Sequence, residues 1–158
     1  MSAITNRHVF VKVSGDLTRR PEVRVFIEKL LRRNSVTICV GGGTQINLAL
    51  KKARFEVGKH GPLGREPTSD KASRIAIKTL AEEQWFLQRE IVPQRHAHTV
   101  ILPVIDLGGV PCHVNGDKMV EVAYLCYKRL YVLTTKDRVE KKQREMEWLA
   151  KKVIVVGF

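Results

Sequence analysis

Aromatic side chains and cysteine are scarce in this sequence. Aromatic residues make up 6% of the chain and hydrophobic residues 44%, so we expect a core built from aliphatic side chains. The three cysteines, Cys39, Cys112 and Cys126, are odd in number and widely spaced, and they lie mostly in apolar runs. This pattern favours reduced core thiols over a disulfide framework or a cysteine metal site. It predicts a reducing, cytoplasmic environment.

Long apolar runs are missing as well. No run approaches the roughly 20 residues that cross a bilayer, and the first residues lack the apolar stretch of a signal peptide. We therefore expect neither a membrane span nor a membrane partner. The length of 158 residues suits one domain, and no repeat or linker marks a second. Residues 1–158 are predicted to form a single domain.

Acidic side chains are outnumbered. The chain has 16 of them against 28 lysines and arginines, which leaves a net charge of +12. Most basic doublets fall on or beside the polar faces of predicted helices, which favours a solvated surface; a nucleic-acid footprint is the alternative. No strand interleaves aromatic and basic residues as RNA-binding strands do. In either case the charge attracts anionic ligands. The doublets are Arg19-Arg20, Arg32-Arg33, Lys51-Lys52, Lys141-Lys142 and Lys151-Lys152.

Strand and helix patterns alternate along the chain. Apolar runs predict strands over residues 9–13, 36–40, 99–105 (interrupted by Pro103), 112–114, 130–133 and 153–156. Apolar spacing predicts helices from Pro21, after residue 43, and over 71–91, 119–127 and 139–152. We expect the helix over 119–127 to be buried on almost every face. The helix after residue 43 should turn Ile46, Ala49, Leu50 and Ala53 inward, and the last helix Met146, Leu149 and Ala150.

The order of these elements predicts an α/β fold. Strands that alternate with helices form a mostly parallel sheet covered on both faces, a three-layer α/β/α sandwich. Residues 57–70 interrupt the pattern with glycine, proline and polar residues. We predict an irregular segment there, which is either a lid or a disordered loop.

Glycine turns follow two of the predicted strands. Gly41, Gly42 and Gly43 stand between the strand over 36–40 and a helix, and Ser14 and Gly15 follow the strand over 9–13. Backbone N–H groups in such turns are free to bind an anion. The two turns therefore predict a phosphate site, although a glycine triplet by itself is more often only a tight turn.

Two charged residues stand at unusual places. Lys12 lies in a buried strand, where a lysine needs a charged partner or an opening to solvent, so we expect it to be functional. Asp117 precedes an apolar helix and is interpreted either as a site residue or as a helix cap. The histidines show no ligand spacing with acidic or cysteine partners, so no protein-bound metal is expected.

Four segments together resemble the amino acid kinase superfamily. Residues 12–16 (KVSGD) are similar to its lysine-plus-glycine turn, closest in form to bacterial UMP kinases. Residues 40–47 (VGGGTQIN) resemble its second glycine turn, nearer to N-acetylglutamate kinase. Residues 113–117 (HVNGD) and 131–139 (YVLTTKDRV) resemble its Asn-x-Asp turn and the strand and turn that follow. The order and rough spacing agree over most of the chain, so the resemblance implies an amino acid kinase-like fold.

The resemblance also implies a role for individual residues. Lys12 would reach the phosphoryl group in flight, and Asp117 would position the lysines of the site. Arg65 would hold the anionic group of the acceptor, although its spacing to Asp70 differs by about one residue from the UMP kinase pattern. Thr44 would contact the acceptor, and Asn115 the acceptor or the nucleotide. The ATP phosphates would lie against Ser14, Gly15, Gly41, Gly42, Gly43 and Thr134.

The chain also departs from the superfamily. The carboxy-terminal half that holds the nucleotide and supplies a second catalytic lysine has no counterpart after Phe158, and Thr135 and Arg138 replace an aspartate and a glycine. The resemblance implies phosphoryl transfer from ATP, with Mg²⁺, to a small carboxylate, carbamate or nucleoside monophosphate, whereas these departures argue against ordinary ATP-dependent catalysis by this chain alone. The ATP site would be reduced, or completed by a second subunit or in a homodimer. A non-catalytic module that binds an anionic metabolite is the first alternative, and a nucleic-acid-binding protein is the second.

Overall fold

The computed structural model describes residues 7–91 and 98–158. Its centre is a five-stranded parallel sheet with the strand order β5-β2-β1-β8-β9. Lys12 sits in the central strand, where it pairs in register with Cys39 on one side and Val132 on the other. The strands are β1 (Arg7–Val13), β2 (Asn34–Val40), β5 (His98–Ile101), β8 (Arg129–Thr134) and β9 (Val153–Gly157).

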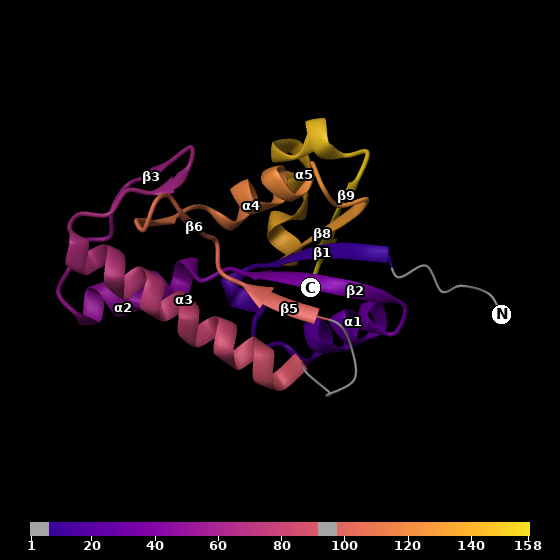
Figure 1. The fold of residues 1–158 in the computed structure, drawn as a ribbon, viewed down its shortest axis with the longest axis horizontal. Helices are drawn as coiled ribbons and strands as arrows, with labels where there is room; N and C mark the ends of the chain where they lie inside the picture. Colours follow the sequence, from indigo (N-terminus) through magenta and orange to yellow (C-terminus); the bar gives the residue numbers. More distant parts are fainter. Residues whose placement is uncertain (1–6, 92–97) are drawn as a thin grey trace.

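Helices cover both faces of the sheet. One layer holds α1 (Pro21–Leu31), α2 (Gly43–Lys52) and α3 (Asp70–Ile91), and the other holds α4 (Gly116–Ala123) and α5 (Val139–Glu145) (Figure 1). The fold is thus the predicted three-layer α/β/α sandwich. Successive strand residues point to opposite faces. In β1, Val9, Val11 and Val13 join the core under α1 to α3, while Phe10 joins the core under α4.

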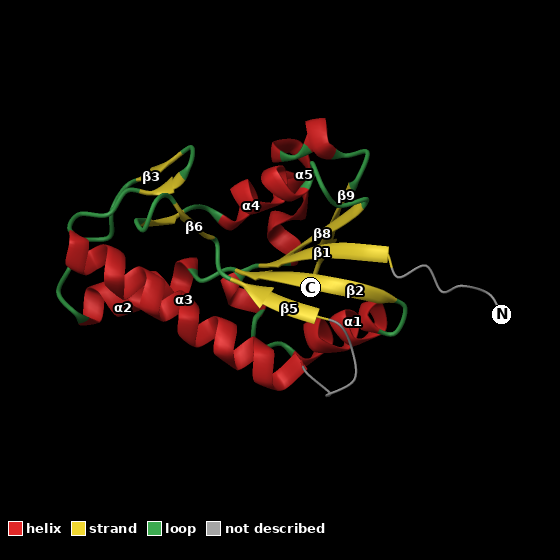
Figure 2. Ribbon diagram, viewed as in Figure 1, coloured by secondary structure: helices red, strands yellow, loops and turns green. Residues whose placement is uncertain are grey.

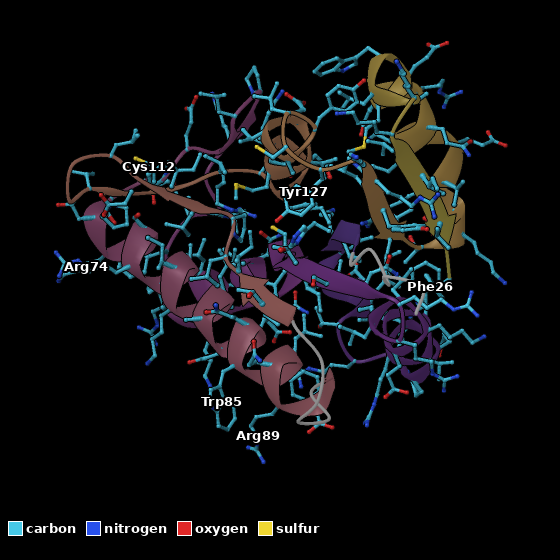
Figure 3. All side chains as sticks on the ribbon, turned by 45° about the vertical axis from the view of Figure 1, so that its right-hand side comes forward. Phe26, Arg74, Trp85, Arg89, Cys112 and Tyr127 are labelled. Atoms are coloured by element: carbon cyan, nitrogen blue, oxygen red, sulfur yellow. The ribbon has the colours of Figure 1, made fainter. Side chains whose placement is uncertain are left out.

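Both cores are mainly aliphatic, as expected. Phe10 is the one aromatic among the largest side chains that are fully buried within residues 7–91 and 98–158. The expectation of core thiols holds for Cys39 alone. Cys112 is half-buried on a hairpin outside the main sheet, above α3 (Figure 3), and Cys126 is exposed in the turn after α4.

Several helix boundaries differ from the predicted ones. α2 ends at Lys52 because Arg54 adopts a left-handed conformation (φ 61°) and Phe55 N donates back to Leu50 O, so Ala53 is exposed. α5 ends at Glu145 and is followed by the short 3-10 helix η3 (Glu147–Leu149), which leaves Ala150 exposed. The predictions that Met146 and Leu149 are buried are confirmed.

The helix predicted over 119–127 starts earlier and is less buried than expected. α4 begins at Gly116 because the side chain of Asn115 caps it by accepting a hydrogen bond from Asp117 N. It ends at Ala123, and only one face packs on the sheet. Val122 and Leu125 are exposed.

Two hairpins lie beyond the carboxyl ends of the main strands (Figure 2). The expectation of an irregular segment over 57–70 is wrong in part, because β3 (His60–Gly61) and β4 (Gly64–Arg65) pair there as an antiparallel hairpin. The strand predicted over 99–105 is broken at Pro103, and its end forms a second hairpin from β6 (Val104–Asp106) and β7 (Pro111–His113).

The strand order places a topological switch beside β1. The chain builds outward from β1 through β2 to β5, and then returns across the sheet to β8 and β9. In open α/β sheets, ligands bind outside the carboxyl ends of the strands at such a point. Two short 3-10 helices, η1 (Gly15–Leu17) and η2 (Lys136–Arg138), follow β1 and β8 there. Among the residues described, no helix combines the length and apolar character needed to span a membrane.

Candidate functional site

A cavity of about 190 Å³ opens at the carboxyl ends of β1 and β2. It brings together nearly all of the residues that the sequence singled out. The exception is Thr134, which is fully buried and is not among the residues lining the cavity, since its strand continues into pairing with Gly157 and its carbonyl accepts from Phe158 N. The predicted residues that line it are Lys12, Ser14, Gly15, Gly41, Gly42, Gly43, Thr44, Arg65, Asn115 and Asp117.

The two glycine turns pack directly against each other. Gly41 N donates to Val13 O at 2.7 Å, and Gln45 Nε2 reaches across to Gly15 O at 2.8 Å. A Cβ on Gly41 would lie 2.7 Å from Val13 O and 2.8 Å from Gly15 N, so only glycine fits. α2 starts at Gly43, and the first N–H groups of a helix have no partner within it. Both turns therefore present backbone donors and a helix N-terminus to the cavity.

Two lysines converge on one carboxylate in this cavity. Lys12 Nζ lies 3.2 Å from Asp117 Oδ1, and Lys142 Nζ, from α5, donates to Asp117 Oδ2 at 2.6 Å. Lys12 also donates to Ser14 Oγ at 3.2 Å. The side chains of Lys12, Asp117 and Lys142 are 8%, 14% and 16% exposed. They form a Lys12–Asp117–Lys142 triad with two positive charges held by one negative charge.

Two members of the triad, Asp117 and Lys142, are held in their charged forms. Burial raises the pKa of the Asp117 carboxyl, but Lys12 and Lys142 outweigh burial and hold it below its ordinary value. Burial lowers the pKa of Lys142, whereas its hydrogen bonds to Asp117 and Glu145 raise it, and the net shift is upward. The interpretation of Asp117 as a helix cap is wrong, because Asn115 caps α4 and the Asp117 carboxylate faces the lysines.

Both carboxylate oxygens of Asp16, which lines the same cavity as the triad, already have partners. The Thr44 hydroxyl donates to its Oδ1 at 2.6 Å, and Arg138 Nη1 contacts its Oδ2 at 3.2 Å. The proton that Thr44 was predicted to offer an acceptor is therefore used within the protein. Arg138, which departs from the superfamily pattern, adds a further cation at the rim of the cavity.

Arg65 is a buried cation that lacks a full set of partners. It is 7% exposed, and its Nη2 donates to Asn47 Oδ1. Its Nε and Nη1 are buried without a hydrogen-bond partner, and no carboxylate of the described residues forms a salt bridge with it. Burial lowers the pKa of Arg65. An unpaired buried charge is costly, so the site calls for an anionic ligand at Arg65.

Two histidines share the wall with Arg65. Burial first, and then the charge of Arg65, lower the pKa of His60. The same causes, with a contribution from His60, lower the pKa of His113 to about 4. Both side chains are therefore neutral at pH 7. Sequence reasoning gave these histidines no role because they are far apart in the chain, and only the two hairpins bring them together.

A resident Mg²⁺ does not fit the side chains of the cavity. Mg²⁺ needs free carboxylate oxygens, but the cavity offers only Asp16 and Asp117 among the described residues, and both already hold cations. The same part of the chain contains no cluster of three or more His, Cys, Asp or Glu side chains that could hold a metal.

The structure corrects one basic doublet. Lys141 is 70% exposed, as expected, but the Lys142 side chain is 16% exposed and lies in the triad. Of the other doublets, Arg32-Arg33 and Lys51-Lys52 are exposed, whereas Arg20 and Lys152 are half-buried, and none of these cations lines the cavity. Lys142 has no motif around it, so its position depends on how α5 packs against β9 and η2.

Neither a protein-family model nor a curated protein sequence matches this chain. The resemblance to the amino acid kinase superfamily stays a prediction from four short segments. The cavity, its triad and its unpaired guanidinium carry the functional argument instead.

The low pKa of His113 predicts a loss of stability in mild acid. An unfolded histidine binds a proton near pH 6.5 and folded His113 only near pH 4, so the free energy of unfolding should fall as the pH drops through that window. Its contribution should be about 2 kcal/mol, allowing for its partial exposure. Urea titrations at pH 7.0, 5.5 and 4.5 should show that the free energy of unfolding declines less with falling pH in His113→Gln than in the unaltered protein. An equal decline in both proteins would contradict this assignment.

Proposed function

We propose that this chain transfers the γ-phosphoryl group of ATP to a small anionic acceptor. The observation that carries the proposal is the triad, in which Asp117 holds Lys12 and Lys142 beside two glycine turns. Phosphoryl transfer needs little covalent help from a protein. It needs positioning and cations for the charge on the transferring oxygens.

Each part of the cavity has a task in this proposal. Lys12 and Lys142 offset the charge on the phosphoryl oxygens, and Asp117 is a positioning residue that fixes both ammonium groups. The glycine turns and the start of α2 hold phosphate oxygens through backbone N–H groups. Arg65 binds the anionic group of the acceptor with its unpaired donors.

The reaction itself is a single displacement. An oxygen of the acceptor anion forms a bond to the γ-phosphorus of ATP. The bond from that phosphorus to the bridging oxygen breaks, and ADP leaves with the electron pair. Because the acceptor oxygen is already anionic, no general base is needed. This agrees with a cavity whose two carboxylates, Asp16 and Asp117, are both paired with cations.

The size of the cavity limits what it encloses. Ligand pockets commonly measure roughly 300–1,000 Å³, and this one is about 190 Å³. We propose that it takes the reacting phosphates and the head of the acceptor, while the base and ribose of the nucleotide lie outside it. The ATP site would then be reduced or completed by a second subunit, and a homodimer is one way to complete it.

ADP formation tests the proposal. Purified protein with Mg-ATP should release ADP faster when a small carboxylate, carbamate or phosphate monoester is added than with ATP alone. Protein that binds such an anion, shown by a rise in melting temperature, without forming ADP would instead support the non-catalytic module. Protein that neither releases ADP nor responds to any of these anions would contradict both.

A further inference from the structure

A second cavity adjoins the first. It measures about 310 Å³ and lies between α2, the first turns of α3 and the β6–β7 hairpin. Arg65 and His113 line both cavities, so they form the boundary between them. Whatever binds the unpaired donors of Arg65 can therefore extend from the phosphate side into the second cavity.

The second cavity differs in chemistry from the first. Its inner wall is apolar: Leu50, Ala72 and Ala76 are 1%, 3% and 4% exposed. Val110 stands at its mouth on the β6–β7 hairpin, with 61% of its surface exposed. Its charged lining, apart from Arg65, consists of the exposed acidic residues Glu56 and Asp70. Such a wall favours a hydrocarbon body, and the acidic rim opposes a second anionic group at its far end.

We infer that the acceptor is a small aliphatic anion, with its single phosphate or carboxylate head on Arg65 and its hydrocarbon body in the second cavity. The inference rests on the proposed function, since it names the acceptor of that reaction. It narrows the expected acceptor class. The ribose and base of a nucleoside monophosphate would bury hydrogen-bonding groups against Leu50, Ala72 and Ala76, whose side chains offer no hydrogen-bond partner.

A chain-length series tests the inference on the intact protein. Calorimetric affinities of methyl, butyl and hexyl phosphate, with acetate, butyrate and hexanoate as the carboxylate arm, should rise with length. Full burial of one methylene is worth roughly a fourfold gain in affinity, until the cavity is filled. The series, phosphate or carboxylate, whose affinity rises more steeply with chain length identifies the head group.

Two matched pairs of variants locate the effect. Ser73 lines the second cavity, whereas its neighbour Arg74 is exposed and projects away from the body of the protein (Figure 3). Ser73→Phe should fill the cavity and remove the gain in affinity that comes with chain length. Arg74→Phe should keep that gain. Val110→Asn should reduce the gain severalfold. Leu107→Asn should not, since Leu107 is 64% exposed on the same hairpin but is not a lining residue.

The outcomes separate this inference from the proposed function. If methyl phosphate or acetate binds but longer chains gain nothing, or if Ser73→Phe and Val110→Asn both fold and keep the gain, the apolar subsite is wrong and the anion site stands. If none of the six anions binds, the anion site fails and the inference fails with it. If the gain in affinity appears and both cavity variants reduce it but no ADP forms, the apolar subsite for an anion stands and the proposed function alone fails.

Discussion

Gly41→Ala should abolish measurable anion binding and lower the free energy of unfolding by about 1–3 kcal/mol. The new Cβ would meet backbone atoms on two sides, Val13 O at 2.7 Å and Gly15 N at 2.8 Å. Neither atom can rotate away as a side chain would. The two glycine turns must therefore separate, and their backbone N–H groups can no longer point at the same ligand.

Gly43→Ala is the matched control. A Cβ on Gly43 meets nothing within 4 Å, and the residue begins α2, where alanine is the better helix former. Stability should be unchanged or rise by about 0.5–1 kcal/mol, because the substitution does not force the two turns apart. Chemical denaturation measures the stability of both variants, and calorimetry with methyl phosphate measures the anion binding. Equal loss of stability in the two variants would mean that the turns act through helix α2 rather than through their close approach.

Lys12→Met and Lys142→Met should each reduce kcat for ADP formation by about 10²–10³-fold, which is the usual cost of losing one preorganised donor to the charge of a transition state. Both ammonium groups contact Asp117, and both are almost entirely withdrawn from solvent. Water therefore has little access to take the place of a lost ammonium group. Methionine keeps most of the length of the side chain, being one atom shorter, and removes its charge.

Lys141→Met controls for the loss of a charge from α5. Lys141 is 70% exposed and contacts only the exposed Glu145, at 3.8 Å, so kcat should change less than twofold. Asp117→Asn should lower kcat more than it raises KM, because it loosens both lysines without removing either. If Lys142→Met behaved like Lys141→Met, Lys142 would be a structural partner of Asp117 and not part of the chemistry.

The sequence was sufficient for the sheet and for most of the cavity. Lys12 and the glycine turns follow directly from strands 9–13 and 36–40, because parallel strands end at one edge of a sheet. Asp117 followed from its place before a helix. Its actual role depends on distances to Lys12 and Lys142 that no local pattern contains.

The missed features depend on contacts between segments far apart in the chain. The strands of the β3–β4 hairpin are two residues long, too short to show an alternating pattern, and their place is fixed by Asn115 N donating to Leu63 O at 2.8 Å. Thr134 was predicted to lie against the ATP phosphates because residues 131–139 resemble a strand and turn of the amino acid kinase superfamily. The structure buries it instead, since β9 extends alongside it and Phe158 N donates to its carbonyl.

The second cavity was beyond sequence reasoning for the same reason. Its wall combines α2, α3 and the β6–β7 hairpin, and each contributes small or aliphatic residues that look like ordinary core positions. The unpaired donors of Arg65 become visible only when every polar neighbour is placed.

Transfer of label from [γ-³²P]ATP to an added acceptor tests the central claim most directly. With hexyl phosphate or hexanoate present, we expect one labelled acceptor for each ADP formed by the unaltered protein, and at least a hundredfold less label with Lys12→Met. Release of the label only as inorganic phosphate, or equal labelling by the Lys12→Met variant, would contradict phosphoryl transfer at the Lys12–Asp117–Lys142 triad.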